Sequence, residues 1–250
     1  MDVLSDILAP YSDDIAKFAG SVTCLQFLSG VFLLNDIRQK RSSDAYPPDP
    51  FLGGIVLTIL SLKMGALMGD EAMIKVNVIG FGINVIFMVV FYWYASEEFR
   101  SKIWSKIGIY FTFTLGCLAY ANFEDPAKIE FRFGMIITAI LVILVGMPLL
   151  NLGKIIETKS TEGLPFPLIL SGTIVAASWA AYGISIRNQV VAYQNLFLFL
   201  LSFIQLSLFA IYPTSPSTST TPEKKKDDSI PYKKMKSNSP SKSKANKKRD

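Results

Sequence analysis

The sequence predicts an all-α membrane protein with seven transmembrane helices, built as two parallel three-helix bundles joined by a linker helix. Three observations predict this fold class. Half of the 250 residues are hydrophobic although residues 213–250 are charged and rich in Pro, Ser and Lys, so the remainder is too apolar for an ordinary soluble domain. Seven stretches approach the roughly 20 apolar residues that a helix needs to cross a bilayer core. The chain also resembles itself at a constant offset.

The expected transmembrane segments follow from the apolar stretches taken in order. They cover residues 15–34, 50–68, 72–95, 107–121, 131–150, 165–184 and 190–212. Each is apolar nearly all round, whereas the core helices of a soluble protein would show a polar stripe with a period of 3.6 residues. Residues 1–14 contain four aspartates and no basic residue, which is typical of an extramembrane segment and not of a cleavable signal peptide.

Basic residues gather in alternate connecting segments, and this asymmetry predicts the orientation. They are Arg38, Lys40 and Arg41 in the first loop, Arg100, Lys102 and Lys106 in the third, Lys154 and Lys159 in the fifth, and eleven residues in 213–250. The positive-inside rule places this side in the cytoplasm and the N-terminus outside the cell. The plasma membrane is the default localisation, with the Golgi or another endomembrane as the alternative.

Residues 213–250 are expected to form a disordered cytoplasmic tail, because Lys, Ser and Pro dominate and few apolar residues are present. The lysines of this tail are expected to bind the headgroups of anionic lipids; alternatively, the tail serves only topology and solubility. Nucleic-acid binding is not expected, since neither interleaved aromatic residues nor a folded basic face accompanies the charge. The sequence leaves the oligomeric state open, and a homo-oligomer is one alternative.

The internal repeat has an offset of 118 residues. At this offset Gly30 falls on Pro148, Arg41 on Lys159, Pro47 on Pro165, Ser61 on Trp179, Gly65 on Gly183 and Asn77 on Asn195. Residues 15–95 therefore correspond to residues 131–212. Three helices are an odd number, so a fourth crossing at 107–121 is needed to give both copies the same orientation. Two parallel units are expected to pack around an axis along the membrane normal, with a pore between them.

Two asparagines and a tryptophan are candidates for ligand binding. The repeat places Asn77 and Asn195 at similar depth on opposite sides of the axis, where their amides could donate to and accept from hydroxyl groups. The alternative is that each forms a hydrogen bond between helices. Trp179 could offer a flat apolar surface and one N–H donor to a hydroxylated ligand; alternatively, it packs in the core or in an interfacial aromatic belt.

Four residues near the predicted cytoplasmic gate are candidate hinges. They are Gly30, Pro50, Pro148 and Pro167. Proline removes a backbone hydrogen bond and permits bending in packed membrane helices, and glycine permits flexing. The alternative is that all four make static kinks that help packing.

Ionisable and metal-binding residues are scarce inside the predicted spans. The sequence has no histidine, and its two cysteines, Cys24 and Cys117, lie within apolar segments, so no zinc site, disulfide framework or His-based catalysis is expected. No Asp or Glu lies mid-span, and Lys63 is the one ionisable side chain well inside a span. Because proton-driven carriers keep such an acid or histidine at membrane depth, passive facilitation is favoured. Neither an enzyme nor a cofactor is expected.

Taken together, the sequence resembles the SWEET family of sugar transporters, and the animal branch more than the plant branch. The resemblance covers residues 15–212. Its clearest stretch begins at Pro148 and contains KIIETKSTEGLPFPL, SWAAYG, Asn195 and LSFIQLSLFAIYP, while the first repeat contributes QFLSG, IRQKRSSD, PFLGG, LKMGAL and VNVIG.

The resemblance implies facilitated, bidirectional transport of mono- or disaccharides by alternating access, with a sugar as the small-molecule partner. It also implies two asparagines and two tryptophans around the sugar and four prolines near the inner gate. The positions that match this pattern are Asn77, Asn195, Trp179, Pro50, Pro148 and Pro167. Three positions depart from it: Ser61 stands for a tryptophan, Gly30 for a proline and Met64 for a tyrosine. Ser61 is therefore expected to enlarge the cavity and to remove a stacking surface.

Two other functions are compatible with the same sequence. One is transport of a different small solute by the same fold, as in the proton-coupled amino-acid exporters of acidic organelles, although their proton-binding acids and Pro-Gln pairs are absent here. The other is a membrane scaffold or receptor that has kept the fold and does not transport.

Overall fold

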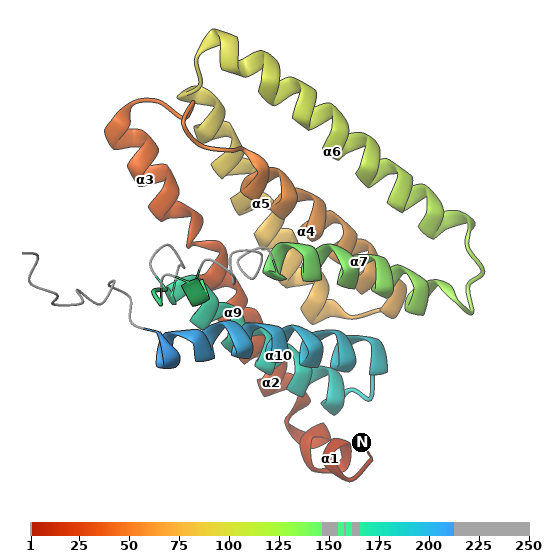
Figure 1. Ribbon diagram of the computed structural model, residues 1–250. Helices are drawn as coiled ribbons and strands as arrows, with labels where there is room; N and C mark the ends of the chain where they lie inside the picture. The colour runs from red at the N-terminus through yellow and green to blue at the C-terminus, as the bar shows by residue number, and fades with distance from the viewer. Residues whose placement is uncertain (1, 147–154, 158, 162–165, 213–250) are drawn as a thin grey trace, which may run out of the picture. The chain divides into compact units, whose positions relative to one another are not determined.

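The computed structural model describes residues 2–146, 155–157, 159–161 and 166–212 (Figure 1). Its elements in these ranges are α1 (Asp2–Leu8), the short 3-10 helix η1 (Ala9–Tyr11), α2 (Ser12–Phe27), α3 (Gly30–Lys40), α4 (Asp49–Met68), α5 (Glu71–Trp93), α6 (Glu97–Phe123), α7 (Ile129–Gly146), α9 (Phe166–Ser185) and α10 (Gln189–Ile211). No strand occurs there, and the predicted all-α class is confirmed. The candidate hinge Pro148, together with Lys154, Pro165 and the tail at 213–250, lies outside the described residues.

Six helical segments in the described part of the chain are long and apolar enough to cross a membrane. They are Val3–Lys40, which contains α1 to α3, and helices α4, α5, α7, α9 and α10. Helix α6 corresponds to the linker expected at 107–121. It is 27 residues long but is not among the six, and three basic residues fall within its first ten positions. It begins ten residues earlier than expected because Ser96 caps it, with Oγ accepting a hydrogen bond from the N–H of Phe99.

The first span, expected as one helix at 15–34, is interrupted in the structure. Helix α2 ends at Phe27 and α3 begins at Gly30. At the break the N–H of Ser29 donates to the carbonyl of Gln26 at 3.0 Å, one residue short of the α-helical pattern. A Cβ on Gly30 would lie 2.6 Å from the ring of Phe87 in α5, so only glycine lets the two helices approach this closely.

The internal repeat is visible in the backbone. Helices α5 and α10 both have 23 residues, and the offset of 118 places one on the other. The residues with positive φ in the described ranges form two pairs at the same offset: Arg41 and Lys159, at 54° and 50°, and Gly69 and Arg187, at 67° and 56°. The left-handed conformation is uncommon for residues other than glycine. Its recurrence at paired turns shows that both copies turn in the same way.

Within each repeat the third helix lies between the first two. Helix α5 contacts α2, α3 and α4, and α10 contacts α7 and α9. The repeats meet at two equivalent seams, where α2 packs against α9 and α4 packs against α7. Helix α6 packs along α4 and leads to the second repeat (Figure 1). The helices of the two repeats therefore form a closed ring in the order α2, α5, α4, α7, α10, α9.

Glycines bring the second and third helices of each repeat close together. A Cβ on Gly65 would lie 3.0 Å from the side chain of Ile74, and a Cβ on Gly183 would lie 2.5 Å from the backbone nitrogen of Ala192. Ile74 and Ala192 are themselves 118 residues apart. The predicted correspondence between Gly65 and Gly183 therefore holds in space as well as in sequence.

Candidate functional site

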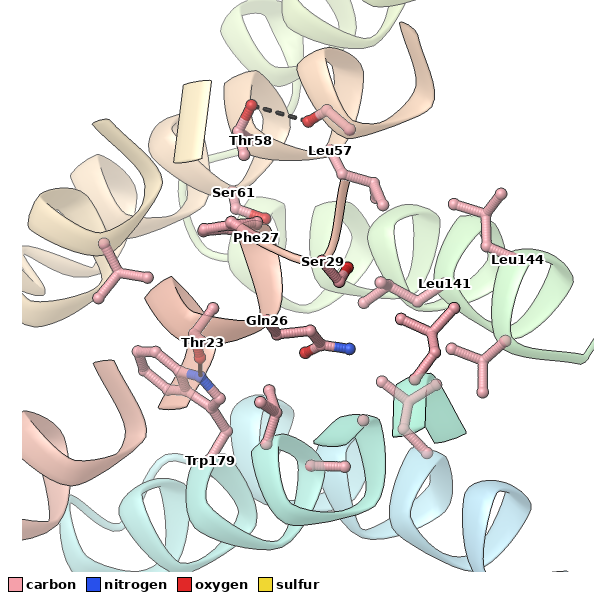
Figure 2. Close-up of a pocket in the computed structure, with 18 of the residues that line it drawn as sticks. Thr23, Gln26, Phe27, Ser29, Leu57, Thr58, Ser61, Leu141, Leu144 and Trp179 are labelled. Carbon is pink, nitrogen blue, oxygen red and sulfur yellow. Dashed lines mark hydrogen bonds between the residues drawn. The ribbon is translucent and has the colours of Figure 1, made fainter. Parts of the chain in front are cut away.

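A cavity of about 540 Å³ lies between the two repeats, and all six helices of the ring contribute to its lining. This volume falls within the range of small-molecule sites. Figure 2 shows side chains from both repeats converging on the space. Most of the residues singled out from the sequence line it: Gly30, Pro50, Ser61, Asn77, Trp179 and Asn195. Pro167, the second residue of α9, is exposed and is not part of the described lining.

The two candidate asparagines occupy equivalent places in the cavity wall. Each is the seventh residue of its helix, α5 or α10. Asn77 Nδ2 donates to the carbonyl of Met73, and Asn195 Nδ2 donates to the carbonyl of Val191, both at 2.9 Å. Each bond uses one amide hydrogen and fixes the side chain against its own helix. The carboxamide oxygen and the second amide hydrogen have no recorded partner in the described ranges and are half-buried at the cavity, where they can accept from and donate to a ligand.

Trp179 lines the cavity, but its N–H is already used. The side chain is 8% exposed, and Nε1 donates to Oγ1 of Thr23 in α2 at 2.9 Å. Thr23 in turn donates to the carbonyl of Ala19 at 2.6 Å, and the indole packs edge-on against Tyr182. The N–H donor that the sequence assigned to a ligand is therefore engaged across the α2–α9 seam (Figure 2). What Trp179 leaves for a ligand is apolar ring surface.

Ser61 occupies the register of Trp179 in the first repeat. It lies in α4, is half-buried and lines the cavity. A serine fills far less space than an indole, so the wall is flat and aromatic on the α9 side and small and polar on the α4 side. The asymmetry expected from the sequence is present in the lining.

Gln26 is one of several polar cavity residues that were not predicted from the sequence. It lies in α2 one turn before the break at Gly30, and its carboxamide extends into the cavity (Figure 2). A Cβ on Gly172 of α9 would lie 3.4 Å from Gln26 Nε2, so the amide lies beside α9. The side chain of Gln26 has no hydrogen-bond partner within the described residues. A glutamine inside an apolar span could have pointed to this position. The residue at the corresponding position of the second repeat, however, is Leu144, so the internal repeat does not mark Gln26.

Other polar side chains of the lining are partly committed to the scaffold. Asn84 Nδ2 donates to the carbonyl of Gly80 at 2.8 Å, and Thr138 donates to Gln194 Oε1 at 2.9 Å. Gln205 Nε2 donates to the carbonyl of Val145 near the end of α7 at 2.5 Å. The last two bonds stabilise the packing of α10 on α7, while the first lies within α5. Gln26 and the asparagine pair remain as the most available amides.

The candidate hinges differ in their surroundings. Gly30 stands at the break between α2 and α3, as described above. Pro50 falls in the first turn of α4, where proline is well tolerated. Its neighbour Asp49 accepts hydrogen bonds from Lys106 at 2.5 Å and from Tyr110 at 3.1 Å, both in α6. This end of α4 is therefore fastened to the linker helix.

The lining carries no formal charge. None of the described residues that line the cavity is Asp, Glu, Lys or Arg. Lys63, the ionisable residue expected within a span, instead donates to Asn122 Oδ1 of α6 at 2.8 Å. No group of three or more His, Cys, Asp or Glu side chains that could hold a metal ion occurs in the described ranges. The cavity can hold a neutral, hydrogen-bonding molecule.

Side chains from both repeats close one end of the cavity, where α5 and α10 begin. Ala19 of α2, Val76 of α5, and Trp179 and Tyr182 of α9 form a buried apolar cluster there. In the turn after α9, Arg187 Nε donates to Ser5 of α1 at 3.1 Å, and its guanidinium also pairs with Asp6. We refer to this set of contacts across the α2–α9 seam as the seam closure.

These features define an integral, multi-pass membrane protein in which two parallel repeats enclose a neutral cavity of ligand size. The chain belongs to the family described as "Sugar efflux transporter for intercellular exchange", whose model matches residues 15–99 and again residues 131–217, one match in each repeat.

Curated relatives and a solved structure agree with this assignment. The chain is 29% identical over 193 residues to Sugar transporter SWEET1 of Drosophila pseudoobscura pseudoobscura, covering 76% of this chain and 85% of the relative. It is 29% identical to Sugar transporter SWEET1 of Homo sapiens, covering 76% and 88%, and 30% identical to Bidirectional sugar transporter SWEET2b of Oryza sativa subsp. japonica, covering 85% and 93%. A 3.7 Å structure of a eukaryotic SWEET transporter superposes with a TM-score of 0.70 at 25% identity, covering 82% of this chain and all of that one.

Proposed function

We propose that this protein is a bidirectional sugar uniporter that carries mono- or disaccharides by alternating access. The observation that carries the proposal is the uncharged cavity between the repeats, with Asn77 and Asn195 at equal register on its two sides. Amides and hydroxyls suit a ligand that presents many hydroxyl groups. The relatives described above are named as sugar transporters, which supports the same substrate class.

The sugar is held, in this proposal, between unlike walls. Trp179 presents apolar ring surface to the C–H face of the sugar, and Asn77 and Asn195 exchange hydrogen bonds with its hydroxyls. Ser61, on the α4 side, leaves space that an indole would fill. Gly30, Pro50, Pro148 and Pro167 are the proposed hinges, and the break at Gly30 is the observation that supports this role for the first of them.

Transport is proposed to be passive, because none of the described lining residues carries a carboxylate that could bind a coupling proton. The charge asymmetry of the loops supports an N-terminus outside the cell and the basic residues at 213–250 in the cytoplasm, where they meet anionic lipid. The seam closure then lies on the outer side. The plasma membrane is the proposed location.

Uptake into liposomes tests the function directly. Full-length protein reconstituted without a pH gradient is expected to equilibrate labelled glucose or sucrose and to exchange it against internal unlabelled sugar. Asn77→Ala and Asn195→Ala are each expected to lower the initial rate at least tenfold, whereas Gln189→Ala, an exposed amide at the start of α10, leaves it unchanged. Absence of flux for every sugar in a panel, or flux only under an imposed pH gradient, would refute the proposal.

A further inference from the structure

A second concavity, of about 680 Å³, lies at the other end of the first repeat, where the loop after α3 meets the turn between α5 and α6. Its walls include Arg38, Arg41, Ser42, Trp93, Tyr94 and Ser96. Two hydrogen bonds fasten the connections to each other: the N–H of Ser43 donates to the carbonyl of Tyr94 at 3.1 Å, and the N–H of Ser96 donates to the side-chain Oδ1 of Asp44 at 3.0 Å. We refer to this feature as the arginine pocket.

The two arginines of this pocket have no anionic partner among the described residues. Eight basic side chains in the described ranges form ion pairs. Arg38 and Arg41 have no carboxylate partner there, and Arg38 contacts only the neutral amide of Asn35, at 3.1 Å. Two neighbouring acids are already engaged. Asp44 accepts from Ser96, which lowers the pKa of its carboxyl, and Glu97 pairs with Arg100 at 2.5 Å. The pocket therefore holds uncompensated positive charge.

The second repeat supplies an internal comparison, because it builds the same junction. Lys159 takes the left-handed conformation of Arg41. The residues at the register of Ser43 and Tyr94 are also joined, although the donor differs: the hydroxyl of Thr161 donates to the carbonyl of Tyr212 at 3.4 Å, whereas in the first repeat the backbone N–H of Ser43 donates to the carbonyl of Tyr94. At the registers of Arg38 and Trp93, however, the second repeat has Ile156 and Ile211. Arg38 and Trp93 are therefore not needed to form the junction, and their presence calls for another role.

The position of the pocket indicates what kind of ligand carries the missing negative charge. Trp93 is the last residue of the membrane-spanning helix α5 and is 79% exposed, which is typical of an indole at the level of lipid headgroups. A guanidinium pair matches the oxygens of a phosphate in geometry and charge, and the hydroxyl of Ser42 can donate to the same group. We propose that the arginine pocket binds the phosphate of one anionic phospholipid, with Arg38 and Arg41 as its ligands and Trp93 against the glycerol region.

Counting retained lipids tests this site in the full-length protein. The protein is exposed in detergent to phosphatidylserine or to phosphatidylcholine, and bound lipids are counted by native mass spectrometry. The wild type is expected to retain one phosphatidylserine that withstands added salt. Arg38→Gln combined with Arg41→Gln is expected to weaken that binding at least tenfold, whereas Lys17→Gln with Lys128→Gln, which removes two exposed charges elsewhere, has no effect. Equal retention by all three proteins would overturn the proposal and assign lipid binding to the basic tail.

Two further arms separate the alternatives. Sodium phosphate is compared with sodium chloride at equal ionic strength, and displacement of phosphatidylserine by phosphate alone would identify a soluble phosphate as the ligand and overturn the lipid assignment.

Ile156→Arg with Ile211→Trp transfers the two distinguishing residues to the second repeat. This variant is expected to retain one additional phosphatidylserine, and no gain would overturn the assignment of Arg38 and Trp93 as the determinants. Sugar flux unchanged from wild type confirms that each variant folds.

Discussion

Trp179 and Ser61 share a register in the two repeats but have different surroundings. The indole N–H donates to Thr23 while the ring lines the cavity, so the proposed contact with the sugar uses only the ring. Trp179→Phe keeps an aromatic surface and is expected to retain most of the flux, whereas Trp179→Ala is expected to abolish it. Initial rates in liposomes measure both. Equal rates for the alanine variant and the wild type would remove Trp179 from the site.

Ser61→Trp tests whether the missing aromatic side chain on the α4 wall affects the choice of sugar. An indole at this position would restore the second aromatic wall and reduce the volume of the cavity, so flux of a monosaccharide is expected to persist while flux of a disaccharide falls. Competition between labelled glucose and unlabelled sucrose measures the change in selectivity. An unaltered preference would show that the α4 wall does not contact the sugar.

Whether Gln26 contacts the sugar can be tested by replacing it with the residue that the second repeat has at the same register. Gln26→Leu gives α2 the side chain that α7 carries at Leu144. Loss of one hydrogen bond, at about 0.5–1.5 kcal/mol, corresponds to a rise in KM of about twofold to tenfold, with the maximal rate little changed. A KM equal to that of the wild type would exclude Gln26 from substrate contact.

At this scale the sequence led to the asparagine pair, because the offset of 118 residues marks positions kept in both copies. The sequence could not lead to Gln26, because the corresponding residue of the second repeat is apolar. It also could not identify the hydrogen-bond acceptor of the Trp179 indole. Thr23 is 156 residues away from Trp179 along the chain, and which hydroxyl meets the indole depends on how α2 packs on α9. That packing is a tertiary property with no local sequence pattern.

The helix boundaries show which ends of helices can be predicted from hydrophobic composition and which depend on tertiary contacts. The starts of α5 and α10 lie within one residue of the bounds expected from the apolar stretches. In the structure Asp70 and Asn188 cap these helices, each accepting a hydrogen bond from a backbone N–H three residues on. Helix α6 was expected to be shorter, since its first turns are charged and lie outside an apolar window. The break before Gly30 was not anticipated, because the close approach of the Phe87 ring to Gly30 comes from another helix and leaves no local sequence pattern.

The turn between α6 and α7 has a pH-dependent contact. Tyr120 and Arg132 both donate to Glu124 Oε2, at 2.5 and 2.7 Å, and the N–H of Asp125 donates to Oε1 at 2.9 Å. These bonds lower the pKa of Glu124 from 4.5 to about 2. A carboxylate with a depressed pKa stabilises the fold above the unfolded-state value and loses that contribution as the pH falls from about 4.5 through about 2.

Glu124→Gln is therefore expected to lower the melting temperature at pH 7, and its difference from the wild type should shrink below about pH 4.5. Thermal unfolding in detergent between pH 3 and pH 7 measures this. Glu98→Gln, an exposed acid with no ion pair in the described ranges, serves as the control and is expected to cause only a small change. If the difference in melting temperature between Glu124→Gln and the wild type did not change with pH, the stabilising role of the Glu124 carboxylate would be contradicted.

For the molecule as a whole, the two seams determine how the repeats can move. Alternating access requires the seam closure to open, and the bond from Trp179 to Thr23 is one of its contacts. Thr23→Val removes the acceptor. A hydrogen bond between membrane helices contributes about 0.6 kcal/mol, so the population open at this end is expected to rise about threefold.

Cysteine labelling measures that shift. Ser61→Cys, in a background with Cys24 and Cys117 replaced by serine, places a thiol in the cavity wall. A membrane-impermeant maleimide applied from the side of the seam closure is expected to label it about threefold faster when Thr23→Val is present. Thr58→Val, at another cavity threonine whose hydroxyl bonds only within α4, is the control. Equal labelling rates in the Thr23 variant and its parent would mean that the bond does not hold the seam closed.

The contact of Arg187 with Ser5 and Asp6 has a practical consequence for producing this protein. The first repeat has Gly69 at the same turn, so only the second repeat reaches out to α1 in this way. An affinity tag or fluorescent reporter fused immediately ahead of α1 would crowd a surface that already holds another part of the molecule. Expression vectors that place the fusion partner at the opposite terminus are the safer choice for imaging and purification.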